Sequence, residues 1–137
     1  MPATFDHYGL RFLYPDNWES VVDPEGGVTL QMPSGGFCSI LREETTHCEA
    51  EILNQIVATI RADYGEVENE PLPIDDFLAE GVATDLRFYY LDLMIVSRVV
   101  IAPLNGQRFV IQFQAESRDF DANEAVFSAI IKQLRET

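Results

Sequence analysis

Residues 8–19, YGLRFLYPDNWE, are the stretch from which the fold is inferred. Its first seven residues alternate like a strand, and Pro15 ends that strand because proline has no N–H to donate to a sheet ladder. Asp16 and Asn17 suit the turn that follows. Trp18, the only tryptophan of the chain, is expected to bury its ring against the sheet. We therefore interpret the stretch as the covered edge of a sheet and not as a working site.

Three short strands are expected in the first third of the chain, over Tyr8–Tyr14, Val28–Gln31 and Phe37–Arg42. A further brief strand near Glu19–Val22 is left open. Glycines in the segments 23–27 and 33–36 supply the turns between the strands, since glycine takes positive φ without steric cost.

An amphipathic helix is expected next, because Ile52, Ile56 and Ile60 recur every four residues and form one apolar stripe. Thr46-His47-Cys48-Glu49 has the spacing of a capping box at its start, and Gly65 is placed to end it. A second helix is expected to close the chain after another capping box, Asp121 with Glu124. Its inward residues would be Phe127, Ile130, Ile131 and Leu134.

Longer strands fill the region between the helices. The acidic stretch Glu66–Pro73 is expected to be an edge strand or a loop. Phe77–Phe88 and Leu93–Ala102 should pair across a turn near Tyr89–Asp92, and the Asn-Gly hairpin signal at 105–106 leads into Arg108–Glu116. Tight turns make neighbouring strands antiparallel. The sequence therefore predicts one α+β domain over residues 1–137, a single antiparallel sheet of about six strands with two α-helices, in the order βββ-α-βββ-α.

The pattern F-x-x-P-x-x-W at the end of the first strand, Phe12-Leu-Tyr-Pro15-Asp-Asn-Trp18, resembles the Mog/PsbP-like superfamily. The later order of elements is similar to it as well, so the resemblance extends from about Phe5 to Leu134. It implies a central antiparallel sheet with helices packed on it, and roles in binding rather than catalysis. Relatives include the Ran-binding Mog protein, PsbP, DcrB-like lipoproteins and the Eag-type chaperones of type VI secretion effectors. No functional residue carries over, since the metal-site histidines of PsbP-type proteins have no match here.

Charge excludes several classes of function. Acidic residues outnumber basic ones 23 to 9, which gives a formal net charge of −14. Binding to nucleic acid draws its affinity from Lys and Arg, so we expect no nucleic-acid partner, and attachment to anionic lipid is disfavoured for the same reason. The charge either keeps the protein in solution or forms an acidic face for a basic partner.

The sequence also predicts no membrane insertion, because no run of about 18 apolar residues occurs. The start MPATFDHYG lacks the features of a signal peptide, so we expect a cytoplasmic location unless a leader has been removed. The two cysteines, Cys38 and Cys48, are too few for a disulfide scaffold, and they form no metal-ligand spacing with His7 or His47.

No residue set predicts catalysis, a cofactor or a metal. Ser34 lies in a Pro-Ser-Gly-Gly turn and not in a nucleophile elbow. Cys38 and His47 could form a thiol–base couple, but a core cysteine beside a helix-start histidine is the better interpretation. Asp75 and Asp76 could bind a cation or act as acid and base, as could the cluster Glu66, Glu68 and Glu70, yet charged edge strands also prevent aggregation.

The apolar residues of 93–101 are the one pattern that favours a function, since both alternating faces of this strand are apolar. A six-stranded sheet is roughly 25–30 Å wide and each helix covers about 10 Å, so two helices leave part of the sheet uncovered. An apolar face left open would favour a protein partner, a second copy or a ligand; loops folded over the gap would not. We expect a non-enzymatic binding or adaptor domain, of which an Eag-like chaperone is one version, and a thiol-dependent or small-molecule-binding enzyme is the alternative. The candidate partner-binding residues are Tyr89, Tyr90, Met94, Val96, Glu66, Glu68 and Glu70.

Overall fold

The computed structural model describes residues 1–136 of the 137-residue chain. The elements are β1 Ala3–His7, β2 Leu10–Tyr14, β3 Glu19–Asp23, β4 Gly27–Gln31, β5 Phe37–Arg42, α1 Glu49–Tyr64, β6 Glu68–Leu72, the 3-10 helix η1 Ile74–Asp76, β7 Val82–Tyr90, β8 Leu93–Leu104, β9 Gln107–Glu116 and α2 Ser117–Arg135. Seven strands form one sheet in the order β3-β4-β5-β9-β8-β7-β6, and β1 with β2 form a separate two-stranded sheet. All strand pairs are antiparallel, so the α+β class is confirmed.

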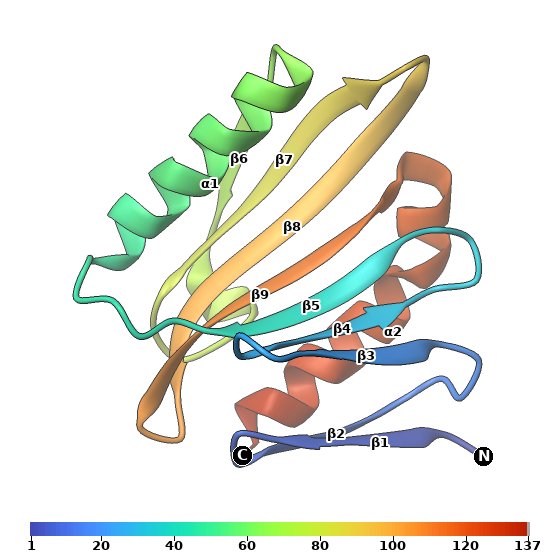
Figure 1. Ribbon diagram of the computed structural model, residues 1–137, viewed down its shortest axis with the longest axis vertical. Coiled ribbons are helices and arrows are strands. Elements are labelled where there is room, and N and C mark those ends of the chain that lie inside the picture. Colours follow the sequence, from blue (N-terminus) through green and yellow to red (C-terminus); the bar gives the residue numbers. More distant parts are fainter. Residues whose placement is uncertain (137) are drawn as a thin grey trace.

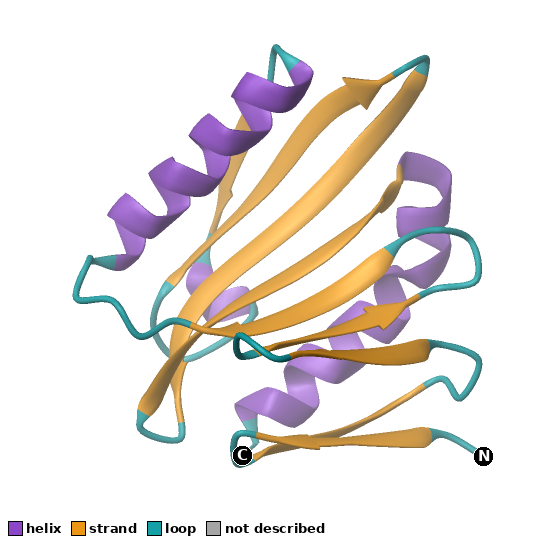
Figure 2. Ribbon diagram, viewed as in Figure 1, coloured by secondary structure: helices purple, strands orange, loops and turns teal. Residues whose placement is uncertain are grey.

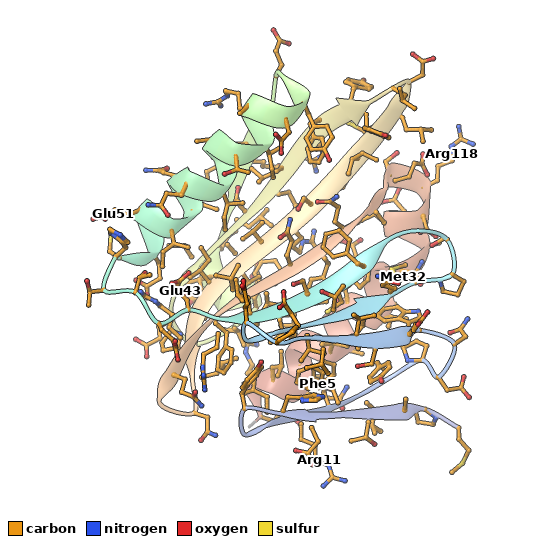
Figure 3. All side chains as sticks on the ribbon, in the orientation of Figure 1. Phe5, Arg11, Met32, Glu43, Glu51 and Arg118 are labelled. Carbon is orange, nitrogen blue, oxygen red and sulfur yellow. The ribbon has the colours of Figure 1, made fainter. Side chains whose placement is uncertain are left out.

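The sheet has seven strands and not six, because both stretches that were left open, β3 and β6, pair as edge strands. The expected first strand Tyr8–Tyr14 is not part of this sheet. Tyr8 and Gly9 take positive φ of 57° and 78° and form a turn, so the chain doubles back and β1 pairs with β2. The ring of Phe5 stacks on that of Phe12 at 4.5 Å, which fixes this hairpin through a cross-strand aromatic pair. Figure 3 shows Phe5 on the inner side of the hairpin and Arg11 on its outer side.

Both predicted capping boxes are wrong. Helix α1 begins at Glu49 after Cys48, and the side chain of Cys48 makes no capping hydrogen bond to a described residue of the helix start. Helix α2 begins at Ser117, four residues before Asp121, because the carboxylate of Glu116 accepts hydrogen bonds from the N–H groups of residues 118 and 119. Strand β9 therefore passes into α2 without a linker. The predicted end of α1 is confirmed, since the N–H of Gly65 donates to the carbonyl of Arg61 at 2.9 Å.

The two helices lie on opposite faces of the sheet (Figure 2). Helix α2 packs on β8, β9 and the β1–β2 hairpin, and the segment that follows β6 covers the same face with Leu78, which is buried. This face carries the larger core, built around Phe109, Phe113 and Phe127. Together the helix, the hairpin and the segment cover the α2 side of the sheet.

On the other face, α1 packs mainly on β7 and β8, and no helix within residues 1–136 covers β3, β4 and β5 (Figure 1). Val99 and Ile101 of β8 lie under α1, whereas Val96 and Val100 lie on the α2 side. We call the uncovered α1-side surface of β3, β4, β5 and β9 the open face. Strand register places the following side chains on it: Glu19, Val21, Asp23, Thr29, Gln31, Phe37, Ser39, Leu41, Gln112 and Gln114. Most are amides, hydroxyls or acids, so this face is more polar than the sequence of β8 led us to expect.

Candidate functional site

A groove runs along the boundary between α1 and the open face. It encloses about 400 Å³ between the inner edge of the helix and the strands β5 and β9. Its apolar lining consists of Leu41, Ile52, Ile56, Ile60 and Val110, and its polar lining consists of Glu43, Gln55, Thr59 and Gln112. The apolar stripe of α1, formed by Ile52, Ile56 and Ile60, is therefore only partly covered by the sheet. The rest of the stripe faces the groove.

The floor beside the groove is a network of amides and hydroxyls. The side-chain amide of Gln112 donates to the hydroxyl of Ser97 at 2.7 Å and to the carboxamide oxygen of Gln114 at 3.3 Å. A glutamine has two N–H donors and one carbonyl acceptor. Within residues 1–136, the carbonyl of Gln112 and the amide nitrogen of Gln114 have no partner. The floor can therefore offer both an acceptor and donors to a bound segment.

Acidic side chains stand around this surface. Glu43 lines the groove, in the segment that links β5 to α1, whereas Glu51 lies on the outer side of α1 and is not part of the groove (Figure 3). A hydrogen bond from His47, at 2.9 Å, and one from Cys48 lower the pKa of Glu51. Glu19 and Asp23 project from β3 at the far side of the open face. The surface is rimmed by carboxylates.

The predicted partner-binding residues fall in a different place, the turn between β7 and β8. Tyr89, Tyr90, Leu91 and Leu93 are 61%, 51%, 81% and 49% exposed, and we call these four residues the hairpin tip. Tyr90 meets the ring of Tyr64 at the end of α1, with centroids 5.8 Å apart. Met94 is half-buried, and Val96 is buried beneath α2.

Glu66, Glu68 and Glu70 lie at the opposite edge of the sheet from β3. Glu66 precedes β6, and Arg87 of β7 pairs with Glu70 at 2.9 Å and with Glu68 at 4.0 Å. Such charges keep an exposed strand from pairing with another sheet. These acids are not part of the groove.

The residues considered for catalysis do not form a common site in the structure. Cys38 is fully buried on β5, and burial raises the pKa of its thiol, whereas His47 is exposed at the start of α1. The hydroxyl of Ser34 donates to Asp119, and Asp75 and Asp76 form the exposed 3-10 turn η1. No group of three or more potential metal ligands occurs in the described part of the chain, and no helix there is long and apolar enough to cross a membrane.

One polar cluster was missed by sequence reasoning. Arg98 donates two hydrogen bonds to the buried carboxylate of Asp85, at 2.8 and 3.0 Å, and pairs with Glu124 of α2 at 3.1 Å. Burial alone would lower the pKa of Arg98, but these two carboxylates outweigh it and raise the pKa. The signal was present, because Asp85 and Arg98 are charges inside otherwise apolar runs of paired strands.

Comparison with known proteins places the fold but not the function. No protein-family model matches the chain, and no curated protein sequence matches it either. The solution structure of the cyanobacterial PsbP protein (CyanoP) from Synechocystis sp. PCC 6803 is similar with a TM-score of 0.61 at 15% identity, over 96% of this chain and 90% of that one. A protein of unknown function, PA94, from Pseudomonas aeruginosa is similar with a TM-score of 0.57 at 10% identity, over 92% of this chain and 90% of that one. The chain therefore has a PsbP-like α+β fold.

Proposed function

We propose that this chain is a small, acidic, non-enzymatic domain that binds a protein partner through the open face. The observation that carries the proposal is the position of α1, which covers β7 and β8 and leaves an apolar groove of about 400 Å³ at its inner edge. Apolar side chains that line an unfilled groove favour contact with another molecule. The buried Cys38 argues against the thiol-dependent alternative, because a protonated, inaccessible thiol is a poor nucleophile.

The chemistry of the groove favours a helical segment of the partner with one apolar stripe. The open face spans four strands, roughly 15 Å across, which accommodates one helix of about 10–12 Å diameter. The helix would place its apolar stripe against Ile56 and Leu41, and polar side chains against the amides of Gln112 and Gln114. Basic residues at its ends would meet Glu43 and Asp23. An Eag-like chaperone that shields an apolar helix of a client is the specific version of this proposal.

Filling the groove tests the proposal. Gln55 is exposed on α1 and lines the groove, whereas its neighbour Asn54 is exposed and lies outside it. We expect wild-type protein and Asn54→Trp to capture the same partner from the native lysate, and Gln55→Trp to lose it. The captured partner is then purified, and its affinity for the three proteins is measured directly.

Two results would overturn the proposal. One is a partner that binds Gln55→Trp as tightly as it binds Asn54→Trp. The other is a partner whose binding segment is not apolar. Sedimentation of the purified domain tests whether the partner is a second copy of the chain. Self-association through the open face predicts a dimer that Gln55→Trp dissociates. The charge of −14 on each copy opposes such a dimer.

A further inference from the structure

Strand β3 is a free edge of the seven-stranded sheet. It stands first in the strand order, and no other strand of residues 1–136 pairs with its outer side. The β1–β2 hairpin, which precedes it in the chain, packs on α2 instead (Figure 1). All residues of Glu19–Asp23 are exposed. An exposed edge strand presents unpaired N–H and C=O groups with which another chain can pair.

The hydrogen bonds of the neighbouring strands show which backbone groups of β3 are unpaired. The N–H of Met32 donates to the carbonyl of Gly36 at 2.8 Å, and the N–H of Arg42 donates to the carbonyl of Gly26 at 3.5 Å. Both bonds lie in the β4–β5 register, so the even-numbered residues of β4 bond to β5 and the odd-numbered residues bond to β3.

The partners of those odd-numbered residues on β3 are Glu19, Val21 and Asp23. Bonding alternates along an antiparallel strand, so the N–H and C=O groups of Ser20 and Val22 point to the free edge. The edge therefore offers two donors and two acceptors at alternate residues.

The valines of β3 also lack a neighbour. Val22 is 56% exposed, although Val28, directly opposite it on β4, is fully buried in the core on the α2 side. Val21 is 41% exposed on the opposite face. An added strand would cover both valines. The other edge of the sheet is less suited to such a strand, because β6 contains Pro71 and its acids are paired with Arg87.

Charge determines which chain fits this edge. Glu19 and Asp23 flank Val21 on the open face, and within residues 1–136 neither makes an ion pair; the carboxylate of Asp23 accepts only the N–H of Glu25, at 2.8 Å. Antiparallel pairing with β3 of a second copy, centred on Val21, would set Glu19 opposite Asp23. Like charges directly opposite each other destabilise a sheet. A segment with basic residues at these two positions has the complementary charge.

We propose that β3 binds an extended, basic segment of a partner protein, which joins the sheet as an added antiparallel strand. Its basic residues lie opposite Glu19 and Asp23, its apolar residues lie opposite Val21 and Val22, and its backbone bonds to the outward groups of β3. This inference goes beyond the binding of a helix in the groove, because it uses the outer edge of the sheet and not the inner edge of α1.

The probe is the capped, fluorescently labelled peptide Gly-Lys-Val-Val-Thr-Lys-Gly. Fluorescence anisotropy follows its binding at about 0.15 M salt, which screens long-range attraction to the acidic protein. We expect saturable binding. Methylation of the backbone nitrogen of the first valine, which faces Val22, should weaken binding at least about tenfold, because it removes a hydrogen bond and blocks the approach of the strand. The same methylation of the second valine, whose N–H points away from β3, should leave binding unchanged.

Protein variants test the charges. Glu19→Lys with Asp23→Lys should lose the peptide. The control Asp63→Lys with Glu66→Lys makes the same change of charge at exposed positions away from β3, and it should bind as the wild type does. Gln55→Trp should also bind as the wild type does, because the groove is not used.

The inference fails if the peptide does not saturate the wild type, if the two methylated peptides bind equally, or if the variant of β3 binds as well as its control. Loss of the peptide in Gln55→Trp would place it in the groove and would also refute the inference. Amide hydrogen exchange gives the last check: the N–H groups of Ser20 and Val22 should become protected only when the peptide is bound. Protection in the free protein would mean that a second copy occupies the edge. The methylated peptides are compared on the wild-type chain, so this result does not depend on the folding of a variant.

Discussion

The indole ring of Trp18 lies 6.2 Å from the ring of Phe127, centroid to centroid, with the two planes inclined at 57°. Trp18 is only 6% exposed, and its backbone N–H donates to the carbonyl of Pro15 at 3.1 Å to close the turn. The tryptophan therefore joins the start of β3 to the middle of α2, about 110 residues later in the chain. It is a core residue, as the sequence predicted, and its partner is the helix rather than the sheet alone.

Replacing this ring should destabilise the whole domain. Trp18→Ala is expected to lower the free energy of unfolding by about 3–5 kcal/mol, because it removes a large buried ring and leaves a cavity against Phe127. Denaturant unfolding followed by circular dichroism measures the change. Trp18→Phe, which retains a ring, should cost clearly less. A Trp18→Ala protein of full stability that had lost its partner would mean that the residue is a binding site instead.

The elements that were predicted correctly are those whose signal is local. The stripe of Ile52, Ile56 and Ile60 predicts α1, and Asn105-Gly106 predicts its hairpin, where both residues have positive φ. The N-terminal hairpin was missed because its turn, Tyr8-Gly9, begins with a tyrosine at φ 57°, and a bulky residue at positive φ is uncommon.

The candidate site was predicted less well, because it depends on which face each helix covers. Tyr89 and Tyr90 are exposed as expected, but Val96 is buried because α2 covers its face of β8. The alternation of Gln112 and Gln114 with apolar residues in β9 did indicate a polar face, and only the strand register places it beside α1. Register over long sequence separations cannot be read from a local pattern.

Removing one partner of the ion pair between Asp85 and Arg98 should strongly lower the free energy of unfolding. Their side chains are 5% and 12% exposed, and Asp85→Ala leaves the guanidinium without its main partner beneath α2. We expect a loss of about 3–5 kcal/mol in the free energy of unfolding, measured by denaturant titration. Glu124→Gln should cost less than about 1 kcal/mol, because Glu124 is 49% exposed and its pair with Arg98 is screened by water.

The double variant Asp85→Leu with Arg98→Met tests the physical reason. Removing both charges leaves no unpaired group, so the double variant should be more stable than Asp85→Ala. If the two proteins are equally unstable, packing around Phe77 and Phe120 matters more than the charges.

Cys38 should make the protein less stable at alkaline pH. Burial raises the pKa of its thiol in the folded state, so folding favours the protonated form. The stabilisation is complete below the thiol pKa of the unfolded chain, about 8.5, and it declines as pH rises above that value. The free energy of unfolding should therefore fall by up to about 1.4 kcal/mol per pH unit above this point.

Cys38→Val removes this dependence and leaves other titrating groups unchanged. The difference in unfolding free energy between wild type and Cys38→Val, measured from pH 7 to 10, isolates the thiol. A constant difference would show that Cys38 is not held protonated by burial.

Leu91 has a conformation that its own side chain disfavours. Its φ is 56° and its side chain is 81% exposed, so the leucine bears the steric cost of the left-handed region without gaining burial. Leu91→Asn should raise the free energy of unfolding by about 0.5–1 kcal/mol, since asparagine tolerates this conformation better. Leu93→Asn, at an exposed position without positive φ, should give no such gain. Denaturant unfolding of both variants measures the change. A loss of stability in Leu91→Asn would contradict the prediction and would mean that Leu91 packs within the domain.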